Sequence, residues 1–256
     1  MITIKSEREI VKMREAGRIT ALVLDQVGKA VAPGVTTKQL DELAEKIIFE
    51  NGGVASFLGY GADTSRGIKG FPGSICASVN DELIHGIPSG RVLKEGDIIS
   101  IDVGVIHNHY HGDAARTFPV GKISPQAERL IEATKKCLES ALEIVKDGVK
   151  LKEIGYSIEK CANIYGYTVT KEFTGHGIGT HLHEDPNVAN YGRPTDNLIL
   201  KAGMTIAIEP MIMTGNPQIK IASNKWTVRS KDGKLNAHHE NTILITQDGY
   251  EILTQL

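Results

Sequence analysis

Apolar residues recur at helical spacing in the first part of the chain. Ser6 followed by Glu9 forms a capping box, and the apolar positions after it follow helical periodicity until the Pro33-Gly34 break. Thr36 and Gln39 repeat the same start signal, and the second apolar stripe ends in an Asn-Gly-Gly sequence. These patterns predict two amphipathic helices, one after Ser6 and one after Thr36.

The middle of the chain contains a second helical region. Ser124-Pro125 is a typical helix start, with serine as the cap and proline at the first helical position, and the helical pattern continues to about Lys146. A fourth helix is predicted from about Leu151 to Tyr165. Strand-like segments lie at residues 74–79, 97–105, 109–120, 167–171, 204–209 and 239–246.

The segment from Gly52 to Gly73 is rich in glycine and has no periodicity. It predicts a long loop, and because loops of that length in compact domains are usually functional, we expect it to border a site. Two helices followed by strands occur twice along the chain, and no low-complexity linker divides it. The pattern predicts one α+β domain over residues 1–256, with a mainly antiparallel sheet covered by helices.

Charge and composition restrict the class of partner. Lys and Arg number 29 and Asp and Glu number 31, so a net charge of -2 offers no broad basic field for nucleic acid or anionic lipid. No segment has the roughly 18 consecutive apolar residues of a membrane span, and the start of the chain lacks the pattern of a signal peptide. Three scattered cysteines do not make a disulfide framework or a thiolate zinc site. We therefore expect a cytoplasmic protein with reduced thiols.

Two aspartates stand in the middle of otherwise apolar strands. Asp102 and Asp113 flank a predicted turn at His107-Asn108, and equal distances from that turn place them directly opposite each other in a hairpin. Their Cβ atoms are then about 5 Å apart. Two buried carboxylates this close repel unless one is protonated or a cation lies between them. The alternative is a solvated pair, which the apolar alternation on the other face of the strand disfavours.

Two glutamates and one histidine extend this acidic set. Glu209 ends one apolar strand and Glu240 begins another, and a buried carboxylate cluster without a cation is badly destabilising. His176 lies in the glycine-spaced segment TGHGIGTHLHEDP, which matches neither the dinucleotide fingerprint nor a phosphate loop. A lone histidine is more often a satisfied core or surface residue, but its neighbours here favour a ligand. Four carboxylates and one imidazole suit two ions such as Mn²⁺, Fe²⁺, Co²⁺ or Zn²⁺.

Five segments together resemble the type I methionine aminopeptidases, which have the pita-bread metallopeptidase fold. The resemblance spans nearly the whole chain and implies that fold, with two divalent metal ions held by Asp102, Asp113, His176, Glu209 and Glu240. It also implies an enzyme that removes the initiator methionine from nascent polypeptides whose second residue is small, by attack of a metal-bridging hydroxide. The segments are SICASVNDELIHGIPS, GDIISIDVGVIHNHYHGD, TGHGIGTHLHEDP, AIEPM and the strand that begins at Glu240.

The resemblance assigns further roles. Glu209 is expected to act as the general base, His183 to steady the tetrahedral intermediate, and His85 to hydrogen-bond the scissile amide. A narrow apolar pocket for methionine is expected to be lined by Phe71, Cys76, His85, Leu182 and Trp226.

The resemblance leaves the shape of the pocket open at Phe71, Leu182 and Trp226, and it leaves the surroundings of Glu240 open. Many family members carry tyrosine where this chain has Phe71 and phenylalanine where it has Leu182, and the family pattern around Glu240 differs at His239 and Asn241. Trp226 has a second interpretation as a packed core aromatic.

The remaining histidines and cysteines have simpler interpretations. His107 and His109 are expected to face solvent beside the hairpin turn, and the role of His111 stays open. Cys137 and Cys161 are expected to be small core residues of two helices.

Several rival functions share this fold. Prolidases, aminopeptidases that cleave before proline, and creatinases carry a large domain ahead of the catalytic one, and type II methionine enzymes carry a helical insertion that we do not find between Glu184 and Glu209. A non-catalytic binding protein predicts broken metal ligands, whereas all five are intact. We expect a monomer that acts on nascent polypeptide N-termini, with ribosome docking, the physiological metal and the pocket shape left open.

Overall fold

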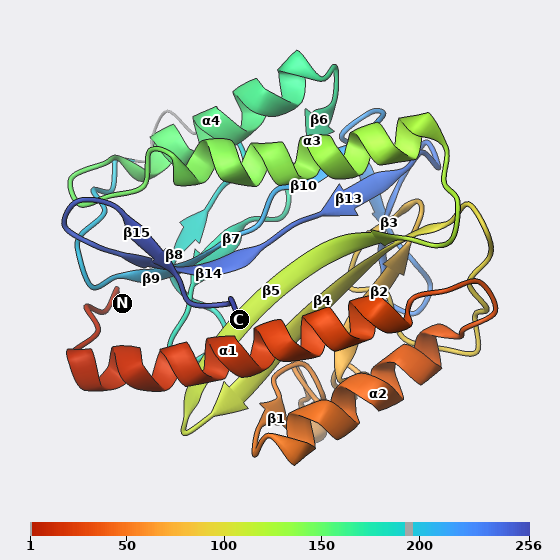
Figure 1. The fold of residues 1–256 in the computed structure, drawn as a ribbon, viewed down its shortest axis with the longest axis horizontal. Coiled ribbons are helices and arrows are strands. Elements are labelled where there is room, and N and C mark those ends of the chain that lie inside the picture. Colours follow the sequence, from red (N-terminus) through yellow and green to blue (C-terminus); the bar gives the residue numbers. More distant parts are fainter. Residues whose placement is uncertain (1, 193–196) are drawn as a thin grey trace.

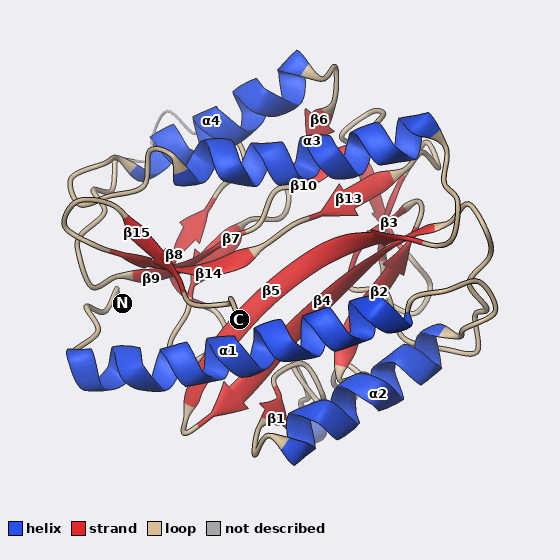
Figure 2. Cartoon of the chain, in the orientation of Figure 1, coloured by secondary structure: helices blue, strands red, loops and turns tan. Residues whose placement is uncertain are grey.

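Two pairs of helices lie on opposite sides of the strands in the computed structural model, which describes residues 2–192 and 197–256 (Figure 1). The first pair is α1 (Glu7–Ala30) and α2 (Thr37–Glu50), and the second is α3 (Pro125–Leu142) and α4 (Leu151–Ile164). Figure 2 shows α1 running along β5 and α3 running beside β13, with strands filling the space between the two helix pairs.

Local capping explains where three of the helices begin. The Ser6 N–H donates to the Glu9 carboxylate at 2.7 Å, and the Gln39 N–H donates to the Thr36 hydroxyl at 3.2 Å. The hydroxyl of Ser124 accepts from the Ala127 N–H at 3.2 Å. All four predicted helices are confirmed, although α3 ends at Leu142 and not near Lys146.

The strand pairs of the described residues are antiparallel, as predicted. In one sheet, β4 pairs with β5 along one edge and with β2 and β1 along the other. A five-stranded sheet has the order β15-β14-β9-β7-β8. The first sheet contains β1 (Val54–Ala55), β2 (Ile75–Val79), β4 (Ile98–His107) and β5 (Tyr110–Pro119). The second contains β7 (Gly175–Gly177), β8 (Glu184–Val188), β9 (Thr205–Ile208), β14 (Asn241–Ile245) and β15 (Tyr250–Ile252).

Two small sheets contain most of the strands that the sequence pattern did not predict. Their orders are β13-β10-β6 and β11-β12-β3. Five of these six strands have only three residues, too few for alternation to be legible. The sixth, β6, has two residues and lies within the predicted segment 167–171. The strands are β3 (Glu82–Ile84), β6 (Thr168–Val169), β10 (Met211–Met213), β11 (Ile219–Ile221), β12 (Val228–Ser230) and β13 (Asn236–His238), and a short 3₁₀ helix covers Thr64–Arg66.

The register of the β4–β5 hairpin differs from the prediction. Asp102 pairs with Ala115 and Asp113 pairs with Gly104, so the two aspartates are not directly opposite. The cause is the turn, which uses Asn108 and His109 at φ 48 and 70. Positive φ at both central residues is the type I′ geometry that suits a two-residue hairpin loop. The aspartates still share one face of the sheet, as diagonal neighbours.

Apolar side chains of the described residues form two large clusters and two smaller ones. One large cluster joins α1 and α2 to the first sheet around Val23 and Ile101, and the other joins α3 and α4 to the second sheet around Leu130 and Ile206. One of the smaller clusters includes Phe71 and lies beside the polar site described below. Among the described residues, none of the helices is both long enough and apolar enough to cross a bilayer.

Gly17 allows α1 to pack closely against the end of the chain. A Cβ atom at this position would lie 2.2 Å from the carbonyl oxygen of Leu253. On the same side of the helix, the Thr20 hydroxyl donates to the carbonyl of Gly112 in β5 at 3.1 Å. The backbone of α1 therefore touches both β5 and the C-terminal segment, and any side chain at position 17 must displace backbone atoms.

We expect Gly17→Ala to lower the free energy of unfolding by about 1–3 kcal/mol, the usual cost of overpacking. Intrinsic helix propensity alone predicts the opposite sign, a gain of about 1 kcal/mol. Gly90→Ala is the matched control, because nothing lies within 4 Å of a Cβ there and its φ is not positive. Urea unfolding of both variants tests this, and equal stability of the two would contradict the packing argument.

Candidate metal centre

The five predicted ligands lie on separate elements and line one cavity. Backbone contacts hold two of these elements together, because the Asp113 N–H donates to the Thr242 hydroxyl at 3.0 Å and the Glu240 N–H donates to the Ala115 carbonyl at 2.9 Å. The ligand candidates are Asp102 in β4, Asp113 in β5, His176 in β7, Glu209 directly after β9 and Glu240 between β13 and β14.

His176 presents its Nε2 atom to the carboxylates. Nε2 lies 3.7 Å from Oδ2 of Asp113 and 3.6 Å from Oε1 of Glu209. On the other side of the ring, Nδ1 lies 2.8 Å from the carbonyl oxygen of Gly177. Because a carbonyl only accepts, the proton is on Nδ1 and the lone pair is on Nε2. This is the tautomer and the backbone contact that orient a histidine toward a metal ion.

Several buried polar atoms of this cluster have no hydrogen-bond partner within the described residues. They are Oδ1 of Asp102, Oδ1 of Asp113, Oε1 of Glu240 and Nε2 of His238. Leaving such an atom unsatisfied costs about 1–3 kcal/mol, and more when it is charged. A cation coordinated by these atoms removes that cost, so the donor set fits divalent metal ions. Two groups have their donor atoms within 4.8 Å of one another: Asp113, His176 and Glu240, and Asp102, His238 and Glu240.

The carboxylates have raised pKa values. Burial raises the pKa of Asp102 to about 7 and that of Glu209 to about 8. The pKa values of Asp113 and Glu240 are raised well above their ordinary range, first by burial and then by the neighbouring carboxylates. Near neutral pH the four groups do not all ionise together without a cation, whereas bound dications favour their charged forms.

His238 is a member of this cluster that the sequence analysis missed. Its Nε2 atom lies 3.5 Å from Oε2 of Glu209 and 3.8 Å from Oε2 of Glu240. The signal was its position two residues before Glu240, because residues i and i+2 of an extended chain point to the same side.

The other predicted site residues line the same cavity, whose volume is about 250 Å³. They are Phe71, Cys76, His85, Leu182, His183 and Trp226. The predicted loop between Gly52 and Gly73 does border the site, because it contributes Phe71 and two residues that the sequence analysis did not select, Phe57 and Tyr60. The remaining lining residues were also missed: Ile84, Phe173 and Thr174.

Two further histidines border the cavity. Nδ1 of His183 lies 2.5 Å from the Tyr60 hydroxyl, and its ring meets that of His176 edge-on with centroids 4.3 Å apart. His85 has a left-handed backbone with φ 58, and its ring packs edge-on against Phe173. Burial lowers the pKa of His85 to about 4, so its imidazole is neutral near pH 7.

The glycine spacing around His176 has a steric reason. A Cβ atom on Gly177 would lie 2.0 Å from the carbonyl oxygen of Asp185, and one on Gly175 would lie 2.3 Å from that of Ala207. The flanking strands β8 and β9 therefore approach β7 more closely than any side chain permits. This close packing fixes the backbone on both sides of His176.

Polar contacts hold the backbone of Glu240. The guanidinium of Arg116 donates to the carbonyl of Glu240 and, at 2.7 Å, to Oδ1 of Asn241. Asn241 also accepts from the Thr254 hydroxyl at 3.1 Å. At the position where the family pattern differs, the side-chain oxygen of Asn241 thus accepts from Arg116 and Thr254 and orders the strand that follows Glu240.

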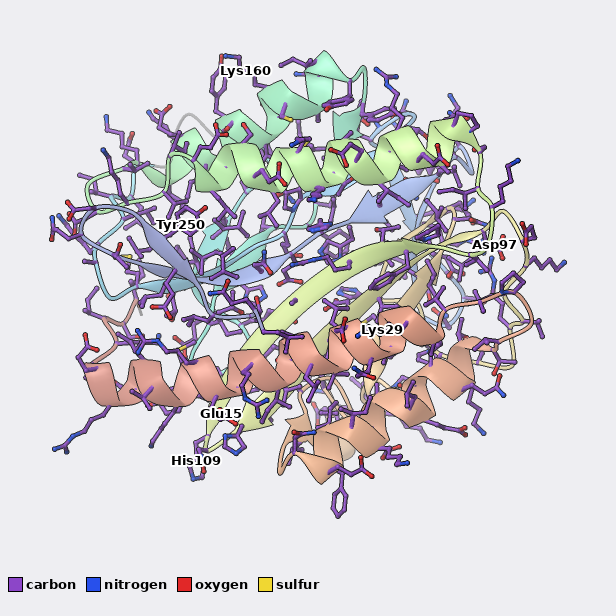
Figure 3. The ribbon with its side chains drawn as sticks, in the orientation of Figure 1. Glu15, Lys29, Asp97, His109, Lys160 and Tyr250 are labelled. Atoms are coloured by element: carbon purple, nitrogen blue, oxygen red, sulfur yellow. The ribbon has the colours of Figure 1, made fainter. Side chains whose placement is uncertain are left out.

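The histidines with simpler interpretations lie outside the cavity. His109 is exposed at the tip of the hairpin, where Figure 3 shows it projecting from the body of the protein, and His107 is half-buried. His111 is buried, with Nδ1 2.9 Å from the Ser56 hydroxyl. Cys137 is buried and Cys161 is half-buried, as expected for small core residues, and both are free thiols.

Trp226 lines the cavity, and its ring packs edge-on against Phe71 with centroids 5.4 Å apart. Its position therefore combines the two alternatives, a pocket residue and a packed aromatic residue. Phe71 itself is buried, so the two aromatic rings form one continuous apolar wall.

Comparison with known proteins relates this site to metallopeptidases. Residues 11–247 match the model of metallopeptidase family M24. A Bacillus subtilis protein named methionine aminopeptidase 1 is 47% identical over 256 residues, which is 100% of both chains. The crystal structure of a methionine aminopeptidase from Thermotoga maritima covers 100% of both chains with a TM-score of 0.95 and 39% identity. These likenesses confirm the predicted pita-bread fold.

A more distant likeness shows the fold alone. The prolidase from Pyrococcus furiosus is 24% identical with a TM-score of 0.78. The matched region covers 99% of this chain and 65% of the prolidase chain.

The raised pKa values predict how metal ions and pH together set stability. Between the ordinary pKa near 4.5 and the folded-state value of about 8, Glu209 keeps a proton in the folded protein that the unfolded chain has lost. Stability of the metal-free protein therefore falls as pH rises through this window. Since a metal ion replaces the proton, Mn²⁺ should raise the melting temperature more at about pH 8 than at about pH 5.5.

Thermal unfolding with and without Mn²⁺ at both pH values measures this effect. Asp113→Ala should lose most of the Mn²⁺-dependent rise and should retain less metal after purification, because it removes one buried carboxylate of the cluster. An equal rise at the two pH values in the unsubstituted protein would count against a metal centre built from these carboxylates.

Proposed function

This chain belongs to metallopeptidase family M24, and from that membership we propose that it is a metal-dependent aminopeptidase. Its reaction is removal of the initiator methionine from polypeptides whose second residue is small. The observation that carries the proposal is the cavity, in which the acidic cluster and an apolar wall containing Phe71 and Trp226 face one space. The likeness to methionine aminopeptidases over the full length of both chains supports the same substrate class.

In our proposal the metal ions would be held by Asp102, Asp113, His176, Glu209 and Glu240. When bound, such ions acidify a water molecule and polarise the substrate carbonyl. In our proposal Glu209 is the general base: its carboxylate takes a proton from the attacking water and passes it to the nitrogen of the departing peptide. Its position supports this role, because Oε1 of Glu209 lies 3.6 Å from Nε2 of His176, within the cluster that would hold the ions.

His183 and His85 are proposed to position the reacting groups. Nδ1 of His183 lies 2.5 Å from the Tyr60 hydroxyl. In our proposal this hydroxyl donates to Nδ1, so the ring proton is on Nε2, which then donates to the negative oxygen that develops from the carbonyl. His85 is proposed to hydrogen-bond the scissile amide. Its half-buried, neutral imidazole supplies one donor and one acceptor without adding a charge to the site.

The apolar part of the cavity suits a methionine side chain. Phe71 and Leu182 are buried, and Trp226 packs edge-on against Phe71. Burial also raises the pKa of Cys76 well above its ordinary value, so its thiol is neutral and acts as a small apolar surface. An unbranched thioether fits such an irregular wall and makes favourable sulfur–aromatic contacts.

We infer that two divalent ions bind, because Glu240 belongs to two distinct donor groups. Co²⁺, Mn²⁺, Fe²⁺ and Zn²⁺ all accept carboxylate and imidazole ligands. We further propose that residues 1–256 act as one catalytic domain and a monomer, in the cytoplasm, on nascent polypeptide N-termini at the ribosome. The absence of a broad basic field in a chain of net charge -2 favours local recognition of the peptide over nucleic-acid binding.

Peptide hydrolysis tests the proposed function. With Mn²⁺ or Co²⁺ present, we expect the protein to release methionine from Met-Ala-Ser and to leave Leu-Ala-Ser and Ala-Pro-Ala largely intact. The reason is that the cavity accepts an unbranched side chain and discriminates between apolar residues by about 10–200-fold. Liquid chromatography with mass detection measures release, and preferential cleavage of Ala-Pro-Ala would indicate the prolidase-related activity instead.

His183→Ala tests the proposed positioning role. Loss of one donor to the developing oxyanion typically lowers kcat by about 10²–10³-fold, and we expect this loss with unchanged metal content. The matched control is His181→Ala, because the side chain of His181 is 82% exposed and does not line the cavity. If the two variants hydrolyse Met-Ala-Ser equally fast, His183 has no part in the chemistry.

A further inference from the structure

His238 is held firmly by its backbone. It is the last residue of β13 and pairs with Met211 of β10. Its N–H donates to the Thr117 hydroxyl at 2.9 Å, and that hydroxyl donates to the His238 carbonyl at 3.0 Å. These contacts come from β5 and β10, so the direction of the His238 side chain is set by two neighbouring strands.

The side chain of His238 faces the acidic cluster, and its Nε2 has no hydrogen-bond partner among the residues that the structure describes. The residue is 2% exposed, and Nε2 is one of the unsatisfied buried atoms. Its nearest carboxylate oxygens, on Glu209 and Glu240, lie at 3.5 and 3.8 Å. These separations are longer than the roughly 2.7–3.2 Å of a hydrogen bond. An unsatisfied buried nitrogen therefore points at carboxylate oxygens that it does not contact directly.

These separations are close to those of two donor atoms that share a metal ion. Donors about 2.0–2.2 Å from one tetrahedral ion lie about 3.3–3.6 Å from each other. His176, on the other side of the cluster, shows the same spacing, with Nε2 3.7 Å from Asp113 and 3.6 Å from Glu209. The two imidazoles thus stand in equivalent relations to the carboxylates.

We propose that His238 is a sixth metal ligand, which coordinates the ion bound by Asp102 and Glu240 through Nε2. This proposal rests on the metal-dependent function above and adds to the five ligands named there. Each ion then has one imidazole, His176 for one and His238 for the other. Because imidazole suits Co²⁺, Zn²⁺ and Fe²⁺ better than Mn²⁺, the second imidazole raises preference for the former ions.

Metal titration of the complete chain provides the first test. Calorimetry with Co²⁺ and with Mn²⁺ should show that His238→Gln weakens one of two binding steps by about 10-fold or more, since even outer partners of metal ligands cost about 10–100-fold. The loss should be larger for Co²⁺ than for Mn²⁺. His239→Gln is the matched control, because His239 belongs to neither donor group. Equal Co²⁺ and Mn²⁺ losses would indicate a structural role and overturn the proposal.

Proton magnetic resonance of the Co²⁺-loaded protein provides a direct count of bound imidazoles. The unsubstituted protein should show two sets of paramagnetically shifted imidazole signals; His238→Gln should lose one and His176→Gln the other. A single set in the unsubstituted protein overturns the proposal without the use of any variant. If the unsubstituted protein shows a single set and still releases methionine, the proposed function is retained and the sixth ligand is rejected. If the unsubstituted protein binds no metal, the proposed function itself is rejected.

Discussion

Mutual repulsion among four buried carboxylates is the constraint on which the rest of this structure depends. Asp102, Asp113, Glu209 and Glu240 line one small cavity, and burial raises the pKa of each. Folding that brings them together costs free energy unless protons or cations neutralise them. The centre of the pita-bread fold therefore carries an unfavourable repulsion energy that bound metal ions would remove. In the proposed function the same ions would take part in peptide hydrolysis.

The surrounding elements make that arrangement rigid. Gly177 allows β7 and β8 to approach so closely that a Cβ atom at this position would lie 2.0 Å from the carbonyl oxygen of Asp185. This close packing fixes the backbone beside His176. Arg116 and Asn241 order the strand that carries Glu240, and Thr242 joins that strand to Asp113. Such supporting contacts contribute to metal binding because they hold each ligand atom in the position from which it can coordinate an ion.

Local chemistry made the helices predictable, and long-range packing made other features unpredictable. Ser6 and Ser124 mark helix starts because capping involves residues only three positions apart. The register of the β4–β5 hairpin differs from the prediction because Asn108 and His109 adopt left-handed backbone conformations. A sequence seldom indicates such a conformation at residues other than glycine. His238 was not predicted as a site residue because its approach to Glu209 depends on the pairing of β13 with β10. The sequence of β13 alone does not indicate that pairing.

Glu240 belongs to both donor groups of the cluster, and its shared position has a thermodynamic consequence. In the proposed two-ion centre, an ion at either position would polarise and order a carboxylate that the other position also uses, so the two binding events would not be independent. Their coupling would be reciprocal: whatever factor the first ion applies to the affinity of the second, the second applies to the first. Metal loading of such a centre is accordingly a cooperative or anticooperative property of the pair of positions and not of each position alone.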